Sequence, residues 1–272
     1  LMDDRINAGT SEQILGKVIK SCRDDVVITS KVTGPIGKLP NDRGSSRFHI
    51  MREVERSLKR LDTDHIDVYI LHEPDYTTPL EEIIRTMDDL VRAGKILYPG
   101  CSNYKAWQVY RALSISEKTN ATPFIIMQNP YSLINRKLEE ELFSLANHTG
   151  VGIMAYSPLG IGLLTLDPES DPPNDSLWIR KNYISDHNQY SNLMKGRTSD
   201  LIKSVRNIAK THNATPAQVA LSWVLSHPEI SVAISGADKE EQMRENVEAV
   251  NISLTEDEIN QLDKKSKGLK LF

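Results

Sequence analysis

Polar side chains that could bind or react with a ligand close six successive apolar segments of the chain. They are Lys31 after VVITS, His72 after DVYIL, Ser102-Asn103 after ILYPGC, Gln128 after FIIM, Tyr156 after VGIMA and Ser235-Gly236 after SVAI. A histidine can orient a carbonyl group by a hydrogen bond, and hydroxyl and amide groups can hold a planar amide by donor–acceptor pairs. One polar residue at a strand end means little, but six in the same position predict one shared site.

The segments that carry these residues read as β-strands, and helical patterns alternate with them. The predicted strands span 26–32, 68–71, 96–100, 124–128, 151–156 and 231–235, and the predicted helices span 11–20, 48–61, 79–93, 104–117, 137–149, 199–212, 216–227, 239–250 and 256–266. Such alternation predicts a parallel sheet covered by helices. In a barrel of this kind, the carboxyl ends of the strands form one rim that carries the chemistry.

Helix caps can be read directly from the sequence. Thr78 is the predicted cap of helix 79–93, with Pro79 in the first position and Glu81 completing a capping box. Thr255, with Glu258 three residues on, is the predicted cap of the last helix, and Thr215 is the predicted cap of helix 216–227, with Pro216 in the first position. The helix boundaries, and therefore the loops between them, are thus well marked.

We expect an α/β fold: a parallel (β/α)8 TIM-type barrel in one domain, residues 1–272, with long rim loops at 33–46 and 160–198. Only about six strands are recognisable where a closed barrel needs eight, so we expect the chain to lack an N-terminal part of roughly 50 residues. An open doubly wound sheet is disfavoured because no Gly-x-Gly-x-x-Gly turn follows an early strand.

Composition narrows the class of protein. The chain has 33 basic and 37 acidic residues and a net charge of −4, which argues against a nucleic-acid partner. No apolar run approaches the length of a membrane span, so no membrane partner is expected. The two cysteines, Cys22 and Cys101, are too few for a disulfide framework and favour a cytoplasmic location. No metal site is predicted, and a monomer or a small homo-oligomer is expected.

Eight stretches, in order and spacing, resemble the aldo-keto reductase family: SEQILGK, VVITSKV, NDRGSSRFHI, EVERSLKRLDTDHIDVYILHEPD, MDDLVRAGKILYPGCSN, QNPYSLINR, GIMAYSPLGIGLLT and AISGADKEEQMREN. The resemblance implies a barrel that binds a nicotinamide dinucleotide and reduces an aldehyde or ketone. It implies that Lys31 and His72 are catalytic and that NADPH is the cofactor, with NADH possible.

The resemblance also implies three groups of cofactor-binding residues. Ser102, Asn103 and Gln128 match groups that hold the nicotinamide carboxamide, and Tyr156 matches an aromatic residue that stacks on the ring. The predicted pyrophosphate loop comprises Ser157, Pro158, Leu159, Gly160, Gly162 and Leu163. The predicted adenosine-side segment comprises Ser235, Gly236, Ala237, Lys239, Gln242, Glu245 and Asn246. Glu73 and Asp75 we interpret as surface turn residues.

Two departures from the family pattern leave alternatives open. The family's catalytic Asp and Tyr would fall on Leu1 and Ile6, which cannot donate a proton, and Asp238 stands where related members often carry an arginine beside a 2′-phosphate. Lys239 and Arg244 could offset that carboxylate. The leading hypothesis is a carbonyl reductase. The alternatives are a non-catalytic nicotinamide-cofactor-binding sensor or regulatory subunit on the same barrel, and a truncated product without a stable function.

Overall fold

The computed structural model describes residues 9–170 and 192–269, and it confirms the predicted α/β class. Within these residues six strands follow one another through the sheet in sequence order, and every described register is parallel. The strands are β1 Thr29–Val32, β2 Ile66–Leu71, β3 Ile96–Ser102, β4 Ile126–Pro130, β5 Gly152–Tyr156 and β6 Ile230–Ile234. Leu1, Ile6 and part of the predicted rim loop 160–198, namely 171–191, lie outside the described residues.

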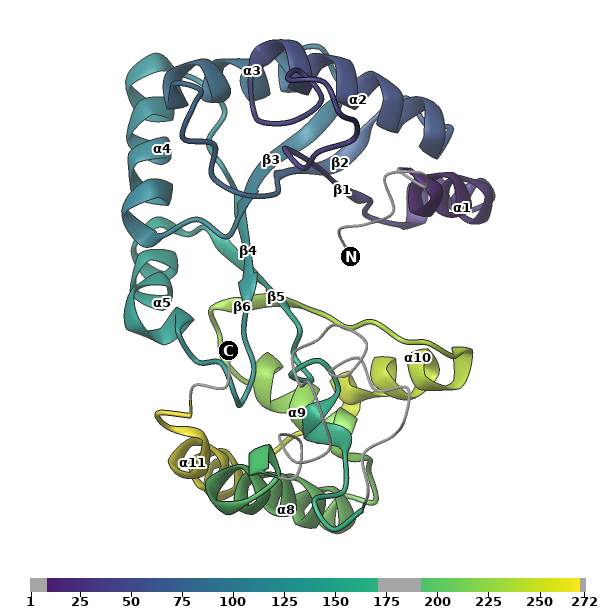
Figure 1. Ribbon diagram of the computed structural model, residues 1–272, viewed down its shortest axis with the longest axis vertical. Helices are drawn as coiled ribbons and strands as arrows, with labels where there is room; N and C mark the ends of the chain where they lie inside the picture. The colour runs from purple at the N-terminus through teal and green to yellow at the C-terminus, as the bar shows by residue number, and fades with distance from the viewer. Residues whose placement is uncertain (1–8, 171–191, 270–272) are drawn as a thin grey trace. The chain divides into compact units, whose positions relative to one another are not determined.

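The helices follow the predicted order (Figure 1). They are α1 Thr10–Ile19, α2 Arg47–Leu61, α3 Leu80–Arg92, α4 Ala106–Thr119, α5 Leu138–Thr149, α8 Gly196–Thr211, α9 Pro216–Leu225, α10 Glu240–Val247 and α11 Glu256–Ser266. Short 3-10 helices span Arg23–Asp25, Leu163–Thr165 and Glu248–Asn251.

The chain divides into two compact units. Unit 1 comprises Leu1–Gln128 with Thr149–Val151, and unit 2 comprises Asn129–His148 with Gly152–Phe272. The predicted catalytic pair and the carboxamide-binding residues belong to unit 1. The predicted stacking, pyrophosphate and adenosine-side residues belong to unit 2. Each unit is therefore described by itself.

Unit 1 packs helices against the parallel strands β1 to β3. Helix α2 contacts α1, α3 and β1, and α3 contacts β3 and α4. The buried faces are aliphatic: Ile50 and Val54 from α2, Ile70 from β2, and Ile83 and Met87 from α3 are essentially inaccessible to solvent. Burying such side chains stabilises by about 1.5–3 kcal/mol each, which fixes the strand ends that carry the polar residues.

In unit 2, helix α9 packs on β6, and α8 packs on both α9 and α11. Strands β5 and β6 pair in parallel, with Tyr156 opposite Ile234. Trp223 on α9 is fully buried, and its ring stacks on Tyr131 with centroids 5.3 Å apart. This aromatic cluster anchors the segment after β4.

The predicted caps are confirmed at two helices and wrong at a third. Thr215 and Thr255 each accept a hydrogen bond from the backbone N–H three residues on, and each forms a capping box. Helix α3 instead begins after Pro79 with no side-chain cap. The Thr78 hydroxyl instead donates to Asp75 Oδ2 at 2.8 Å.

No helix in the described residues is long and apolar enough to cross a bilayer.

Candidate functional site

In unit 1, Lys31 and His72 end neighbouring parallel strands. Lys31 lies opposite Ile70 in the β1–β2 register, and the backbone N–H of His72 donates to the Val32 carbonyl at 2.9 Å. The backbone ladder therefore sets the offset between the two residues. The structure brings this predicted pair together.

The surroundings of the pair lower the pKa of both side chains. Both side chains are accessible to solvent, yet the protein atoms around their charged ends lower the pKa of each by partial desolvation. For His72 the charge of Lys31 adds to this lowering of the pKa, and Glu73 opposes it. A neutral imidazole can donate to a carbonyl oxygen through one nitrogen.

The three residues predicted to hold a carboxamide lie together: Ser102 ends β3, Asn103 follows it, and Gln128 is on β4. Ser102 and Gln128 are opposite each other in the register, and both are buried. The Asn103 backbone N–H donates to the Gln128 carbonyl at 3.0 Å. Its side-chain Nδ2 donates to Ser102 Oγ at 3.1 Å and to the His72 carbonyl at 3.0 Å. Asn103 therefore links the residues predicted to hold the carboxamide to the end of β2, where His72 lies.

A left-handed backbone makes this arrangement possible. Asn103 has φ of 62°, a region that asparagine tolerates better than most residues. The reversal turns its side chain back towards β2, as the bond to the His72 carbonyl shows. The sequence placed Asn103 at the strand end, but this conformation was not predicted.

In unit 2, the segment after β5 is a tight series of turns. The Gly160 N–H donates to the Ser157 carbonyl at 2.9 Å, and the Gly162 N–H donates to the Leu159 carbonyl at 3.1 Å. Ser157, Gly160 and Gly162 all have positive φ, as does Ile161. A Cβ on Gly160 would stand 2.3 Å from Ile134 Cδ1, so a side chain at that position would force Ile134 to shift. This turn directly follows Tyr156, whose carbonyl accepts from the Tyr131 N–H at 3.2 Å.

The predicted adenosine-side residues form a second group in unit 2. Asn246 is buried on α10, and its Nδ2 donates to Ser235 Oγ at 2.8 Å. The backbone carbonyl of Glu245 accepts a hydrogen bond from Gln218 Nε2 at 2.9 Å. Gly236, Ala237 and Lys239 lie on the exposed stretch between Ser235 and the helix. The side chain of Asn246 thus fixes the end of β6 relative to α10.

The start of α10 is unfavourable for a phosphate. Gln242 Oε1 accepts from the backbone N–H groups of Asp238 and Lys239, at 3.0 and 3.2 Å, so its carbonyl occupies donors that an anion would need. Arg244, which we expected to offset Asp238, is bonded to Glu240 at 2.7 Å. The first turn is also acidic, with Glu240 and Glu241.

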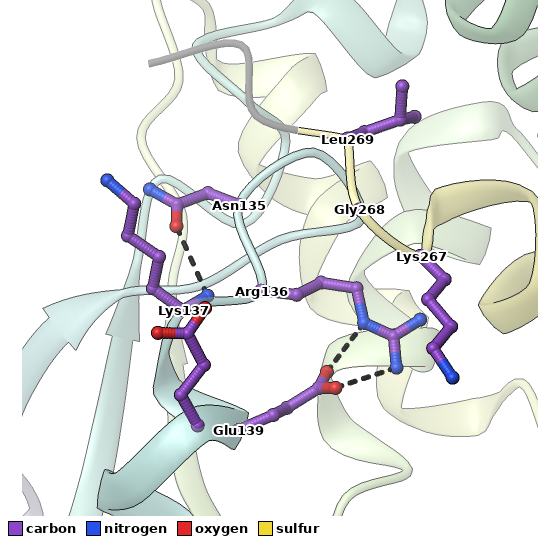
Figure 2. A pocket seen from close by; sticks show the side chains of 8 residues that line it. Asn135, Arg136, Lys137, Glu139, Lys267, Gly268 and Leu269 are labelled. Atoms are coloured by element: carbon purple, nitrogen blue, oxygen red, sulfur yellow. Dashed lines mark hydrogen bonds and ion pairs between the residues drawn. The ribbon is translucent and has the colours of Figure 1, made fainter.

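A cavity of about 340 Å³ in unit 2 has none of the predicted site residues in its lining (Figure 2). It is lined by Asn135, Arg136, Lys137, Glu139, Glu140, Lys267, Gly268 and Leu269. Arg136 donates to Glu139 through Nε and Nη2 at 2.6 and 2.9 Å, and its Nη1 donates to Asp263 Oδ1 at 2.9 Å and to Ser266 Oγ at 2.7 Å. The guanidinium therefore holds the start of α5 against α11 through these hydrogen bonds.

Sequence reasoning missed two residues at the strand ends of unit 1. Thr33 follows β1 with φ of 97°, which is strained for a β-branched residue. Asp75, which we interpreted as a surface turn residue, is half-buried and accepts four hydrogen bonds from the protein. Its Glu-Pro-Asp context was the only signal, and that signal is shared with ordinary turns.

Comparison with known proteins identifies the family. The sequence model described as the aldo/keto reductase family matches residues 7–267. The chain belongs to the aldo/keto reductase family, which confirms the resemblance inferred from the sequence. Leu1 and Ile6 lie outside the matched residues.

Individual relatives carry two kinds of name. A probable voltage-gated potassium channel subunit beta of Oryza sativa subsp. japonica is 35% identical over 90% of this chain and 75% of the relative. A putative subunit of the same description from Schizosaccharomyces pombe is 36% identical, over 94% of this chain and 76% of the relative. An uncharacterized oxidoreductase, YrpG, of Bacillus subtilis is 36% identical over 94% of this chain and 78% of the relative. These names alone do not separate an enzyme from a channel subunit.

Proposed function

We propose that this chain is an oxidoreductase that reduces an aldehyde or a ketone to an alcohol with NADPH or NADH as the hydride source. The observation that carries the proposal is the placement of Lys31 and His72 on adjacent strand ends, with Asn103 bonded to the His72 carbonyl. Membership of the aldo/keto reductase family and the similarity to an oxidoreductase support it.

The residues of unit 1 have distinct roles in the proposed reaction. A bound nicotinamide would supply a hydride to the carbonyl carbon, and a proton from solvent would join the carbonyl oxygen. Neutral His72 donates a hydrogen bond to that oxygen and orients the carbonyl. The positive charge of Lys31 stabilises the negative charge that develops on the oxygen. The alcohol is the product.

The chemistry of the donor set fits a nicotinamide. Ser102 supplies a hydroxyl, and Asn103 and Gln128 supply amides, so donors and acceptors are present for a carboxamide. In unit 2, Tyr156 offers an aromatic face, and the turn Ser157–Leu163 has the glycines that a close backbone approach requires. We assign these residues, with the adenosine-side group, to the cofactor.

Between the two cofactors, the start of α10 favours NADH. By the family resemblance Asp238 would lie beside a 2′-phosphate. Glu240 and Glu241 add negative charge to the same helix start, and Glu240 engages Arg244. Like charges repel, although exposure to solvent weakens the effect. The family resemblance implies NADPH, and the ratio of the dissociation constants for NADPH and NADH decides between the two cofactors.

The second candidate function is a non-catalytic cofactor-binding regulatory subunit. It is favoured by the relatives named as potassium channel beta subunits, at 35–36% identity. Both proposals expect nucleotide binding, and only the first expects turnover.

One experiment separates the two functions. NADPH and NADH are titrated by fluorescence, and their oxidation is then followed with 4-nitrobenzaldehyde. The reductase proposal expects turnover that falls at least a hundredfold in Lys31→Met and His72→Ala, the range for loss of an acid–base or charge-stabilising group. The surface variants Lys59→Met and His148→Ala are matched controls that keep wild-type rates. Tight binding without turnover supports the regulatory subunit, and absence of binding rejects both.

A single barrel domain, a small-molecule carbonyl as the partner, a monomer or small homo-oligomer and a cytoplasmic location remain predictions that accompany this proposal.

A further inference from the structure

A single carboxylate joins the two loops that follow β1 and β2. Asp75 Oδ2 accepts from the backbone N–H of Ser45 at 2.6 Å and from the hydroxyl of Thr78 at 2.8 Å. Asp75 Oδ1 accepts from the backbone N–H and the hydroxyl of Thr77, at 2.8 and 2.6 Å. Both oxygens are therefore engaged, and Ser45 lies 30 residues away along the chain.

The bond to Ser45 continues back to the end of β1. Ser45 is fully buried, and its hydroxyl lies 3.0 Å from that of Thr33. The Thr33 carbonyl accepts from the Gly44 N–H at 2.8 Å. Thr33 is two residues beyond Lys31, so a short chain of hydrogen bonds connects Asp75 with the strand end that carries the lysine.

Thr33 needs such support because its backbone is strained. Its φ of 97° lies outside the regions that a β-branched residue adopts readily, and such a conformation persists only when surrounding contacts hold it. Thr33 is buried, and its partners Ser45 and Gly44 belong to the segment that Asp75 anchors. Loss of the anchor would let the strained residue relax and move the end of β1.

On its other side, Asp75 is continuous with the strand end of His72, three residues earlier. The His72 backbone is held by its N–H bond to the Val32 carbonyl and by the Asn103 bond to its own carbonyl. Asp75 thus connects the loop that follows Lys31 with the loop that follows His72, beyond the last hydrogen bond between β1 and β2.

The carboxylate stays ionised at any working pH. Hydrogen bonds from Thr77, Ser45 and Thr78 outweigh the opposing effect of burial and lower the pKa of Asp75 to about 2. Charge-assisted bonds of this kind are roughly twice as strong as neutral ones. A neutral asparagine side chain in this position would form weaker hydrogen bonds. Its NH2 group would also face the N–H or hydroxyl donors of Ser45, Thr77 or Thr78.

We propose that Asp75 is a positioning residue, which fixes loop 33–46 and thereby sets the placement of Lys31 relative to His72. This proposal rests on the proposed carbonyl reduction, because the pair acts on one oxygen in that reaction. Both oxygens of Asp75 are bonded within the protein, so its proposed effect is transmitted through the loop. Its loss should therefore reduce the rate of the chemical step and leave cofactor affinity intact.

Asp75→Asn tests the proposal, since it keeps the shape of the side chain and removes the charge. We expect kcat to fall about tenfold, as misplacement of reacting groups causes, while the Kd of the cofactor stays within twofold. Hydrogen exchange at the Ser45 amide should become faster, and the NMR signals of the His72 ring should move. Asp75→Glu, which restores the carboxylate, should recover part of the rate.

A carboxylate of similar bonding provides the control. Asp88 Oδ1 accepts from the backbone N–H and hydroxyl of Thr122, at 2.9 and 2.8 Å, in the loop that precedes β4. Asp88→Asn should destabilise the fold to a similar extent and leave kcat and the His72 signals unchanged. A merely structural role for Asp75 would make the two variants behave alike.

The outcomes separate this proposal from the proposed function. If wild type binds the cofactor but does not turn over, carbonyl reduction is rejected, and the Ser45 exchange rate and His72 signals still decide the positioning role. If Asp75→Asn leaves both of these unchanged, the positioning proposal is overturned. Active wild type with an unaltered kcat in Asp75→Asn overturns it too.

Discussion

His72 lies beside Lys31 at the ends of two adjacent parallel strands, and the charge of Lys31 is one of the two causes that lower the pKa of His72. Burial is the larger cause. The pair is thus an electrostatic unit as well as a geometric one, and a change at one residue should be measurable at the other.

Lys31→Met should raise the pKa of His72, because it removes one lowering cause, but not fully to 6.5, since burial remains. The direction in which pH changes the free energy of unfolding follows from the difference in the His72 pKa between the folded and unfolded states. A folded-state pKa below the unfolded value means that the unfolded chain binds the proton more readily. Unfolding therefore becomes easier as pH falls below about 6.5, and the variant should lose less stability there. NMR titration of the ring protons measures the pKa directly. Lys59→Met is the control, and an unchanged His72 titration in Lys31→Met would contradict the coupling.

Gly160→Ala should destabilise the protein by about 2–4 kcal/mol, because left-handed strain and overpacking add. Its φ is 58°, and the new Cβ would press on Ile134. Gly162→Ala in the same turn is a matched control, with φ of 88° and no atom within 4 Å of the added Cβ. It should cost only the strain, about 1–2 kcal/mol. Denaturant unfolding compares them, and equal losses would argue against the close packing on Ile134.

Arg136→Lys should destabilise unit 2 by about 2 kcal/mol, because a lysine cannot reproduce the paired bonds to Glu139 together with those to Asp263. The guanidinium also lies over the Trp223 ring, 5.2 Å from its centroid. The melting temperature measures the effect. Arg244→Lys, at an exposed pair with Glu240, should leave it unchanged. Equal melting temperatures for wild type and Arg136→Lys would show that the Arg136 hydrogen bonds to Glu139 and Asp263 do not stabilise the protein.

Asp238→Ser should tighten NADPH binding about fivefold and change NADH binding less than twofold. Removing an exposed like charge near a phosphate is worth about 1 kcal/mol or less. Fluorescence titration with both nucleotides gives the ratio. Asp257→Ser, which removes an equal charge at the start of α11, controls for net charge. If both variants tighten NADPH equally, Asp238 is not beside the 2′-phosphate.

The sequence alone determined the order of the elements and the residues at the strand ends. Lys31, His72, Ser102 and Gln128 could be placed because a strand end is a local property, visible where an apolar run meets a polar residue. The caps at Thr215 and Thr255 were predictable for the same reason, since each bond spans three residues.

The tertiary structure decided what depends on distant partners. Asp75 read as a turn residue because its anchor, Ser45, lies 30 residues earlier, and Thr78, the predicted cap of α3, donates to the same carboxylate instead. Arg136 and Asp263 meet across 127 residues. No local pattern encodes such pairs, because they form only when packing brings separate segments within hydrogen-bonding distance.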